Sequence, residues 1–407
     1  MMLSTIVVAG GGQSGGRMAE ALRTEGYTGR ILLVGEEPHL PYERPPLSKD
    51  VATGSSEEAT AALGDEVFWK ERRIELELGS AIEAIDTKRK SVSIAGRAAI
   101  GYDQLVLATG ARPRRLPLFD DPALPITYLR TLTDARWVRE RLAPGRRVII
   151  IGAGVIGLEI ASSVVKMGGH ATVIEAAPGV MGRAATPTVA GWMLRLQRQN
   201  GVNFHLNARI EKVDRAADGL VVTLDDDSRI EGDFAVVGIG VVPNDQLAAE
   251  GGISVNDGVI VDAQGRTSDP AVWAVGDVAR HPVAGQLVRQ ETWRHADNHP
   301  RVVAKAILGG GDRYEEIPGY WSDQFGQRLQ VEGSLAGEEV IRNAGDGAAP
   351  MAFYLLGGKL VGMAALQNSK GVALARRMIA SGSSFSPADL ADPSVDLRAL
   401  LKKQASA

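Results

Sequence analysis

The chain contains no cysteine among its 407 residues. This absence excludes structural disulfides, cysteine-ligated zinc and cysteine-ligated iron–sulfur clusters. It also excludes a catalytic thiol and any redox relay through a cysteine pair. If the protein handles electrons, they must therefore leave directly from a bound cofactor.

Long apolar runs and a strong excess of positive charge are also missing. No segment approaches the roughly 20 uncharged apolar residues of a membrane span. The formal net charge is −4, so no overall positive field attracts nucleic acid. The first strand is expected from Ile6, which leaves no room for a signal peptide. We therefore expect a cytoplasmic protein that binds neither membrane nor nucleic acid.

A glycine-rich turn occurs twice, each time directly after an apolar run. The runs are Ile6–Ala9 and Val148–Ile151. The turns have the spacing G-x-G-x-x-G, with glycines at Gly10, Gly12, Gly15 and at Gly152, Gly154, Gly157. In this motif the first glycine permits the tight turn, the second lets the backbone approach a pyrophosphate, and the third lets helix and strand pack. The following helix offers its N-terminal N–H groups to the phosphates.

An acidic residue follows each turn at the distance that the motif requires. Glu36 ends the next apolar strand after the first turn, and Glu175 does so after the second. Such a carboxylate binds a ribose hydroxyl about 20 residues after the turn. Two unrelated tight turns are the alternative interpretation, but two complete copies in register argue against it. The repeat predicts two bound dinucleotides and hence redox chemistry.

The order of these motifs predicts an α/β fold with two Rossmann-like dinucleotide-binding domains and a C-terminal α+β domain. A third apolar strand ends at Gly276-Asp277, after the second dinucleotide unit. We expect a discontinuous first domain at residues 1–115 and 239–318, a second domain at 116–238 and a C-terminal domain at 319–407.

The ordered motifs resemble a known family. They are the two turns with their acids, the loop Leu40–Lys49, Ala108-Thr109-Gly110, Glu159, and Ala274–Asp277. Together they resemble the oxygenase-coupled, NADH-dependent ferredoxin reductases, of the putidaredoxin reductase and Rieske dioxygenase reductase type, within the FAD/NAD flavoproteins that share the glutathione reductase fold. The resemblance extends from about Ile6 to Leu401.

The resemblance implies two cofactors and a set of residues for each. For FAD these are Gly10, Gly12, Gly15, Glu36, Arg44, Pro45, Lys49, Thr109, Gly110, Arg130, Asp277, Glu291, Thr292, Trp293 and Trp321. For NAD they are Gly152, Gly154, Gly157, Glu159 and Glu175. For Trp293 and Trp321, simple packing in the hydrophobic core is an equally open alternative to a contact with FAD.

Lys49 and Glu159 are implied to meet near the flavin N5 and to act as the catalytic pair. A solvated helix face is the alternative for Glu159. Glu175 favours NADH over NADPH, because its carboxylate repels a 2′-phosphate and Ala176-Ala177-Pro178 offers no arginine; Arg183 is the nearest one.

The resemblance implies an enzyme that passes electrons from NADH through FAD to a [2Fe–2S] ferredoxin, which serves a cytochrome P450 or a Rieske-type oxygenase. An acidic ferredoxin would need a local basic patch on this protein. The candidates are Arg301 and the cluster Arg112, Arg114, Arg115, but the favoured interpretation of either one alone is an ordinary solvated surface. An NADH oxidase or other acceptor reductase, and a non-catalytic NADH-responsive flavoprotein, are the alternatives.

The sequence departs from the family pattern after Trp293. The family usually has Asn-Ala and then Gln there, whereas this chain reads Arg294-His295-Ala296-Asp297-Asn298-His299-Pro300, with His295 and His299 four residues apart. Their spacing of four suggests a metal site, but Pro300 and the lack of nearby further ligands argue against it, and we expect no metal. The identity of the ferredoxin, the oxygenase and its substrate, and the oligomeric state, are not encoded in any motif.

Overall fold

The computed structural model describes residues 4–283, 285–342 and 349–405. Its contacts divide the chain into two compact units. Unit 1 comprises the described parts of Met1–Pro46, Ser56–Pro113 and Val241–Glu316, and unit 2 those of Leu47–Ser55, Arg114–Gly240 and Ile317–Ala407. We describe each unit by itself.

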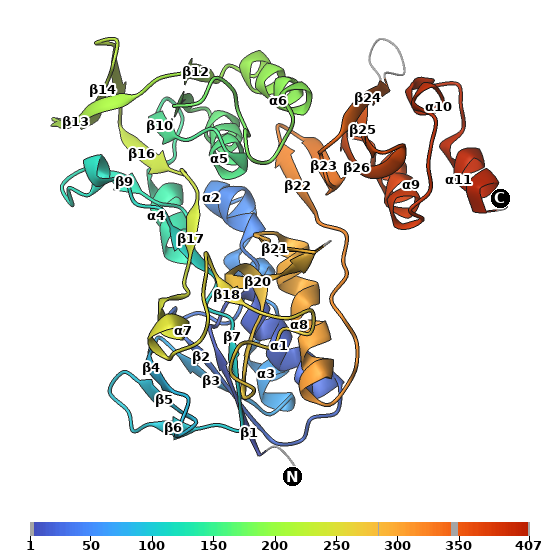
Figure 1. Cartoon of the computed structure of the whole chain (residues 1–407). Coiled ribbons are helices and arrows are strands. Elements are labelled where there is room, and N and C mark those ends of the chain that lie inside the picture. Colours follow the sequence, from blue (N-terminus) through green and yellow to red (C-terminus); the bar gives the residue numbers. More distant parts are fainter. Residues whose placement is uncertain (1–3, 284, 343–348, 406–407) are drawn as a thin grey trace. The chain divides into compact units, whose positions relative to one another are not determined.

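Unit 1 is built on a five-stranded parallel sheet in the order β19-β7-β1-β2-β3 (Figure 1). Its strands are β1 (Thr5–Ala9), β2 (Arg30–Gly35), β3 (Ile74–Leu78), β7 (Gln104–Leu107) and β19 (Val272–Ala274). The apolar run of β1 is continuous because both faces of the strand are buried. Ile6 and Val8 face one core cluster, and Val7 and Ala9 face another.

Helices and small sheets cover both faces of this parallel sheet. Helix α1 (Gln13–Thr24) connects β1 to β2 and packs beside α8 (Trp293–Ile307). The other elements are η2 (Glu58–Ala61), α3 (Glu66–Glu71), β4 (Ile82–Asp86), β5 (Ser91–Ile94), β6 (Ile100–Gly101), β8 (Ala111–Pro113), β17 (Val241–Pro243), α7 (Gln246–Glu250), β18 (Val259–Ile260), η4 (Gly276–Val278), β20 (Ala279–Val283) and β21 (Gln286–Arg289).

Unit 2 contains a second five-stranded parallel sheet, in the order β12-β11-β10-β16-β9. Its strands are β9 (Ile126–Thr127), β10 (Arg147–Ile151), β11 (His170–Glu175), β12 (Asn203–Leu206) and β16 (Phe234–Val237). Its smaller elements are α2 (Asp50–Thr53), η3 (Pro117–Phe119), α4 (Leu132–Arg141), α5 (Val155–Lys166), α6 (Pro187–Gln199) and the antiparallel strands β13 (Ile210–Ala216), β14 (Gly219–Leu224) and β15 (Arg229–Gly232).

The C-terminal part of unit 2 is an antiparallel sheet, in the order β22-β23-β26-β25-β24, with three helices. The strands are β22 (Gly319–Gln324), β23 (Gln327–Gly333), β24 (Glu338–Arg342), β25 (Met351–Leu356) and β26 (Lys359–Leu366), and the helices are α9 (Ser369–Ala380), α10 (Pro387–Ala391) and α11 (Leu397–Ala405). The expected fold class, with two parallel dinucleotide-binding sheets and a C-terminal α+β part, is confirmed. The domain boundaries stay a prediction.

The proline-rich segment that ends at Lys49 is not a loop throughout. A short 3₁₀ helix, η1, spans Pro45–Ser48, and α2 follows directly. Proline is tolerated at the start of a helix because its fixed φ suits the first turn, where its missing N–H would have no partner within the helix. Within the described residues, no helix has the length and apolar character needed to cross a membrane.

Candidate cofactor sites

The first glycine turn of unit 1 leaves open space at one of its three glycines. Gly10 has a φ of +125°, and a Cβ added to it would lie 2.2 Å from the Ala108 carbonyl oxygen. A Cβ on Gly15 would lie 1.8 Å from the Gly10 carbonyl oxygen. A Cβ on Gly12 would meet nothing nearer than the Arg44 guanidinium, at 3.8 Å. The fold therefore requires glycine at the first and third positions, whereas the second is open to a ligand.

The second turn, in unit 2, repeats this geometry. Gly152 has a φ of +99°, and its Cβ would lie 2.5 Å from the Gly238 carbonyl oxygen. A Cβ on Gly157 would lie 2.1 Å from the Gly152 carbonyl oxygen, while nothing lies within 4 Å of one on Gly154. Helix α5 begins at the next residue, so its free N–H groups face the same open space. Both turns thus fit the pyrophosphate of a dinucleotide.

Glu175, the last residue of β11, is fixed against the second turn. Its Oε2 accepts a hydrogen bond from the Ala153 N–H at 2.7 Å, and its Oε1 accepts one from the Ala177 N–H at 2.8 Å. An ionised carboxylate has about four lone-pair sites, so acceptors remain for the hydroxyls of a ribose. Arg183 lies beyond the end of β16, which β10 separates from β11: the Arg183 Nη2 is 2.6 Å from the position that a Cβ on Gly240 would occupy.

Glu36 follows β2 and is exposed, as a ribose-binding acid requires. The next residue, Glu37, is engaged within the protein: it accepts a hydrogen bond from the Tyr42 hydroxyl and pairs with Arg44 at 3.1 Å. Burial opposes the charge of Arg44, but Tyr42, Glu37 and Asp277 outweigh it and raise the pKa of Arg44. Nothing in the sequence distinguishes Glu37 from its acidic neighbour Glu36, so the contacts of Glu37 were not predicted.

The segment with Gly276-Asp277 lies directly on the first turn of α1. Gly276 has a φ of +70°, and a Cβ on it would lie 2.0 Å from the Ser14 Oγ. The Gln13 side chain donates to the Trp293 carbonyl oxygen at 3.3 Å. The structure therefore brings Asp277 and Trp293 to the end of α1 where the open Gly12 lies.

The other residues expected at FAD divide between the two units. In unit 1, Thr109 and Asn244 are joined by two hydrogen bonds of 2.7 and 2.8 Å, and Gly110 has a φ of +65°. Thr292 caps α8 by accepting from the His295 N–H at 3.2 Å, and Glu291 is exposed and pairs with Arg289.

Arg130 and Trp321 lie in unit 2, in front of α4 and on β22 respectively, and both are half-buried. Pro45 begins η1 in unit 1, while Lys49 belongs to unit 2. The cofactor contacts of all these residues stay predictions.

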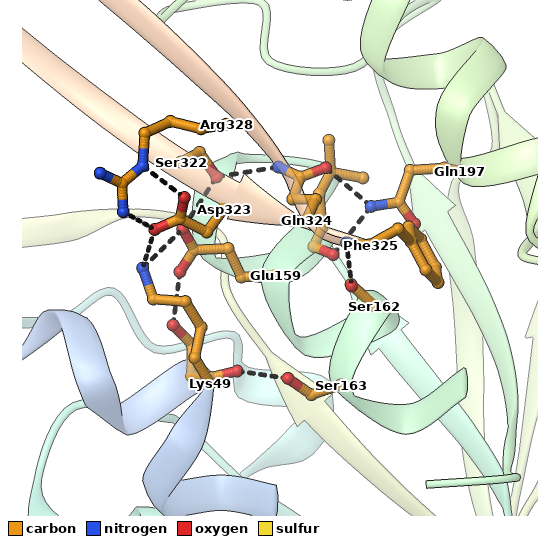
Figure 2. Close-up of polar contacts among 12 residues, drawn as sticks. Lys49, Glu159, Ser162, Ser163, Gln197, Ser322, Asp323, Gln324, Phe325 and Arg328 are labelled. Carbon is orange, nitrogen blue, oxygen red and sulfur yellow. Dashed lines mark hydrogen bonds and ion pairs between the residues drawn. The ribbon is translucent and has the colours of Figure 1, made fainter. Parts of the chain in front are cut away.

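Lys49 and Glu159 meet inside unit 2, as Figure 2 shows. The Lys49 Nζ lies 3.4 Å from Glu159 Oε1. Glu159 is only 3% exposed, so the alternative of a solvated helix face is wrong. Its carboxylate also accepts hydrogen bonds from Ser48 at 2.5 Å and Ser322 at 2.8 Å. Burial raises the pKa of Glu159, and the positive charge of Lys49 and the two hydroxyl donors oppose that rise.

Three histidines form a buried stack in unit 1 that the sequence only partly indicated. The ring centroids of His295 and His299 on α8 are 4.7 Å apart, and His281 from β20 lies 4.8 Å from His295. Tyr314 contacts all three rings. Pro300 does not end the helix, since α8 continues to Ile307. Within the described residues, no group of three or more His, Asp or Glu side chains is arranged to hold a metal.

Comparison with known proteins identifies the family of both parts. Residues 4–310 match the pyridine nucleotide-disulphide oxidoreductase family, and residues 320–401 match the reductase C-terminal family. The ferredoxin–NAD(+) reductase component of the anthranilate 1,2-dioxygenase system of Burkholderia cepacia is 37% identical over 406 residues, which cover 98% of this chain and 100% of that protein.

Two further relatives are similar over nearly their full length. Rhodocoxin reductase of Rhodococcus erythropolis is 36% identical, covering 97% of this chain and 93% of that protein. The reductase in the crystal structure of the covalent putidaredoxin reductase–putidaredoxin complex superposes with a TM-score of 0.96 at 31% identity and 99% coverage of both chains.

Proposed function

This chain belongs to the pyridine nucleotide-disulphide oxidoreductase family, and we infer that it is an FAD-dependent reductase that transfers electrons from NADH to a [2Fe–2S] ferredoxin. The observation that carries this inference is that each unit has a glycine turn with open space beside its second glycine, Gly12 in unit 1 and Gly154 in unit 2. The disulphide chemistry named in the family description is not available here, because the chain has no cysteine. The ferredoxin would in turn serve a P450 or Rieske-type oxygenase, as the dioxygenase systems of the relatives suggest.

The residues of each unit suit one of the two cofactors. The N-terminus of α1 and the open Gly12 would hold the FAD pyrophosphate, and Glu36 would bind the adenosine ribose. The N-terminus of α5 with Gly154 would hold the NADH pyrophosphate, and the fixed carboxylate of Glu175 would bind its ribose. Lys49 and Glu159 would align the nicotinamide and set the charge around the reacting atoms. When bound, FAD supplies the step from a two-electron hydride donor to a one-electron acceptor.

We also propose that NADH is preferred over NADPH. Both oxygens of Glu175 accept backbone hydrogen bonds, so the carboxylate cannot turn away from an incoming 2′-phosphate without losing them. Charge repulsion therefore acts against NADPH. A cytoplasmic location also remains a proposal, and cell fractionation would test it.

Stopped-flow mixing of the FAD-loaded protein with NADH tests the function. We expect NADH to bleach the flavin quickly and an added [2Fe–2S] ferredoxin to restore its colour faster than oxygen does. Absence of bleaching would show that the inferred function is wrong. Rapid NADH consumption with oxygen alone would favour an oxidase, and a long-lived charge-transfer complex would favour a non-catalytic flavoprotein.

The same experiment with NADPH tests cofactor choice. Replacing Glu175 by Gln removes the charge, so we expect the ratio of kcat/KM for NADH over NADPH to fall about tenfold, the equivalent of one hydrogen bond to a charged group. The exposed Glu211 of β13 gives a matched control, since Glu211→Gln changes the net charge equally. An unchanged ratio in Glu175→Gln would contradict the assigned role.

A further inference from the structure

A chain of buried polar side chains leads to Glu159 from two other parts of unit 2. Ser322 and Gln324 come from β22, and Gln197 comes from α6. Gln197 and Ser322 are 0% exposed and Gln324 is 1% exposed. Figure 2 shows these side chains as a continuous series that ends at the Glu159 carboxylate. None of the three carries a sequence motif, and the hydrogen bond from Ser322 to Glu159 spans 163 residues of sequence.

A backbone carbonyl determines the direction of every hydrogen bond in this series. The Gln197 Nε2 lies 2.9 Å from the Leu158 carbonyl oxygen, which can only accept. The amide nitrogen of Gln197 must therefore face Leu158, and the same nitrogen donates to Gln324 Oε1 at 2.8 Å. Because its oxygen is used there, Gln324 turns its own nitrogen toward Ser322.

The last two hydrogen bonds follow from the same logic. Gln324 Nε2 donates to the Ser322 Oγ at 2.9 Å, so the Ser322 hydroxyl hydrogen is left for Glu159 Oε1, at 2.8 Å. Each donor in the series thus points toward the carboxylate. Hydrogen bonds aligned in one direction polarise one another, which strengthens the donor at the end of the chain.

The charged groups around Glu159 cannot replace this donor. Lys49 lies 3.4 Å from Glu159 Oε1 and also 3.8 Å from Asp323 Oδ2, so its charge is shared. Asp323 is in turn paired with Arg328, whose Nε and Nη2 lie 2.7 and 3.0 Å from its two carboxylate oxygens. Ser48 supplies Oε2. Without Ser322, Oε1 would keep only the long contact to Lys49 in a site that excludes water.

We propose that Ser322, Gln324 and Gln197 are positioning residues for NADH oxidation, which act by holding the Glu159 side chain ionised and in one orientation. The inference rests on the proposed function, since it assigns Glu159 a place beside the reacting nicotinamide. A purely structural role is already filled by another serine: Ser162 of α5 accepts from the Phe325 N–H at 2.8 Å and so ties the same helix to the β22–β23 turn.

The protonation of Glu159 can be followed without any NADH. In the FAD-loaded protein, infrared difference spectra across a pH titration report the C=O stretch of a protonated buried carboxyl group, and loss of this band in Glu159→Gln assigns it. We expect Ser322→Ala to move the midpoint of the Glu159 titration upward by about one pH unit, the size expected for loss of one hydrogen bond to a charged group. Ser322→Thr keeps the hydroxyl and should retain the original midpoint.

Variants at the distal end and a matched serine complete the test. Gln197→Met should shift the midpoint in the same direction but by less, because three successive hydrogen bonds connect Gln197 to the carboxylate. Ser162→Ala removes a hydroxyl from α5 that is also buried, with 3% of the residue exposed, and should leave the midpoint unchanged. If Ser322→Ala does not retain FAD, Gln324→Leu and Gln197→Met decide the question, since both leave the Ser322 hydroxyl in place.

Stopped-flow reduction by NADH then connects the titration to function. We expect the acid limb of the flavin reduction rate to move with the infrared midpoint in Ser322→Ala and to stay in place in Ser162→Ala. An unshifted infrared midpoint, an equal shift in both serine variants, or a shifted midpoint with an unshifted rate profile would each overturn the proposal. If NADH reduces none of the proteins, the proposed function fails, whereas the infrared result still decides whether the chain controls Glu159.

Discussion

At the scale of single residues, three buried histidines in unit 1 are kept uncharged by their surroundings. Burial lowers the pKa of His281 to about 4 and, together with the nearby His281, that of His295 to about 3. The pKa of His299 is lowered by the same two causes, burial and the neighbouring imidazoles. His299 also contacts the segment with Gly276-Asp277, since its Nδ1 accepts a hydrogen bond from the Gly276 N–H at 3.4 Å. Protonation of the stack should therefore loosen the turn that carries Asp277.

The sign of the pH effect follows from these lowered values. In the unfolded chain a histidine has a pKa near 6.5, so below this pH the unfolded state binds more protons than the folded state. Folding stability should then fall as the pH falls from about 6.5 toward about 4, with a slope of about 1.4 kcal/mol per pH unit for each histidine. We expect FAD release and a lower Tm over this range.

Replacing the two histidines of α8 tests this prediction. The double variant His295→Asn, His299→Gln replaces both imidazoles by amides that do not titrate, and its Tm should depend less steeply on pH between about 6.5 and about 4. His170, which is exposed at the start of β11, gives the control His170→Asn. An equally steep pH dependence in the double variant would contradict the role of the stack. Flavin fluorescence and thermal unfolding measure both effects.

At the scale of the element, each strand–turn–helix unit contains two glycines that the fold needs and one glycine beside which the fold leaves open space. Gly152 and Gly157 are closed in by carbonyl oxygens at 2.5 and 2.1 Å from an added Cβ, whereas Gly154 is open. Gly154 also has a φ of −72°, which alanine adopts without strain. Folding and cofactor binding should therefore respond to different substitutions within one turn.

We expect Gly154→Ala to raise the KM for NADH at least tenfold while leaving the Tm of the FAD-loaded protein within about 1 °C, because the methyl group occupies only the space of the pyrophosphate. Gly157→Ala is the matched comparison and should lower the Tm by several degrees, because its methyl group meets backbone. Steady-state kinetics and thermal unfolding of the two variants provide the measurements. A destabilised Gly154→Ala with unchanged KM would show that the open space does not receive NADH.

At the scale of the whole molecule, the balance of charge bears on the protein partner. The chain has 45 Lys and Arg residues against 49 Asp and Glu, so an acidic ferredoxin would have to meet a local positive patch. Several candidate arginines are already engaged: Arg301 pairs with Asp297 at 3.2 Å, and Arg115 with Asp120 at 2.8 Å. Their role in docking stays a prediction.

Ionic strength should affect the two half-reactions of the enzyme differently. These are the reduction of the flavin by NADH and the reduction of ferredoxin by the flavin. We expect the rate of ferredoxin reduction at low ferredoxin concentration to fall about tenfold between roughly 0.05 and 0.5 M salt, because salt screens the attraction between exposed charges. Flavin reduction by NADH, in contrast, needs no encounter with a charged protein partner and should change much less. Equal salt dependence of both half-reactions, measured by stopped flow, would argue against electrostatic docking.

The geometry of the two glycine turns was predictable because it is local. A strand, a glycine turn and a helix N-terminus lie within about a dozen consecutive residues, so their geometry follows from short-range sterics at Gly10 and Gly152. Glu175 was predictable for the same reason, since the parallel pairing of β10 and β11 brings it to the turn. The Lys49–Glu159 pair spans 110 residues, and only the family resemblance indicated it.

The sequence by itself determined that the chain binds two dinucleotides and that no thiol takes part, because glycine spacing and the absence of cysteine act without regard to distant residues. Only the tertiary structure decided the surroundings of Glu159 and the histidine stack. Ser48 and Ser322 reach Glu159 from separate segments, and Gln197 is connected to it through Gln324 and Ser322. His281 lies in β20, whereas His295 lies in α8. Polar side chains of this kind have no periodic signature, and their partners are chosen by burial, where each unpaired group costs free energy and must find a donor or acceptor.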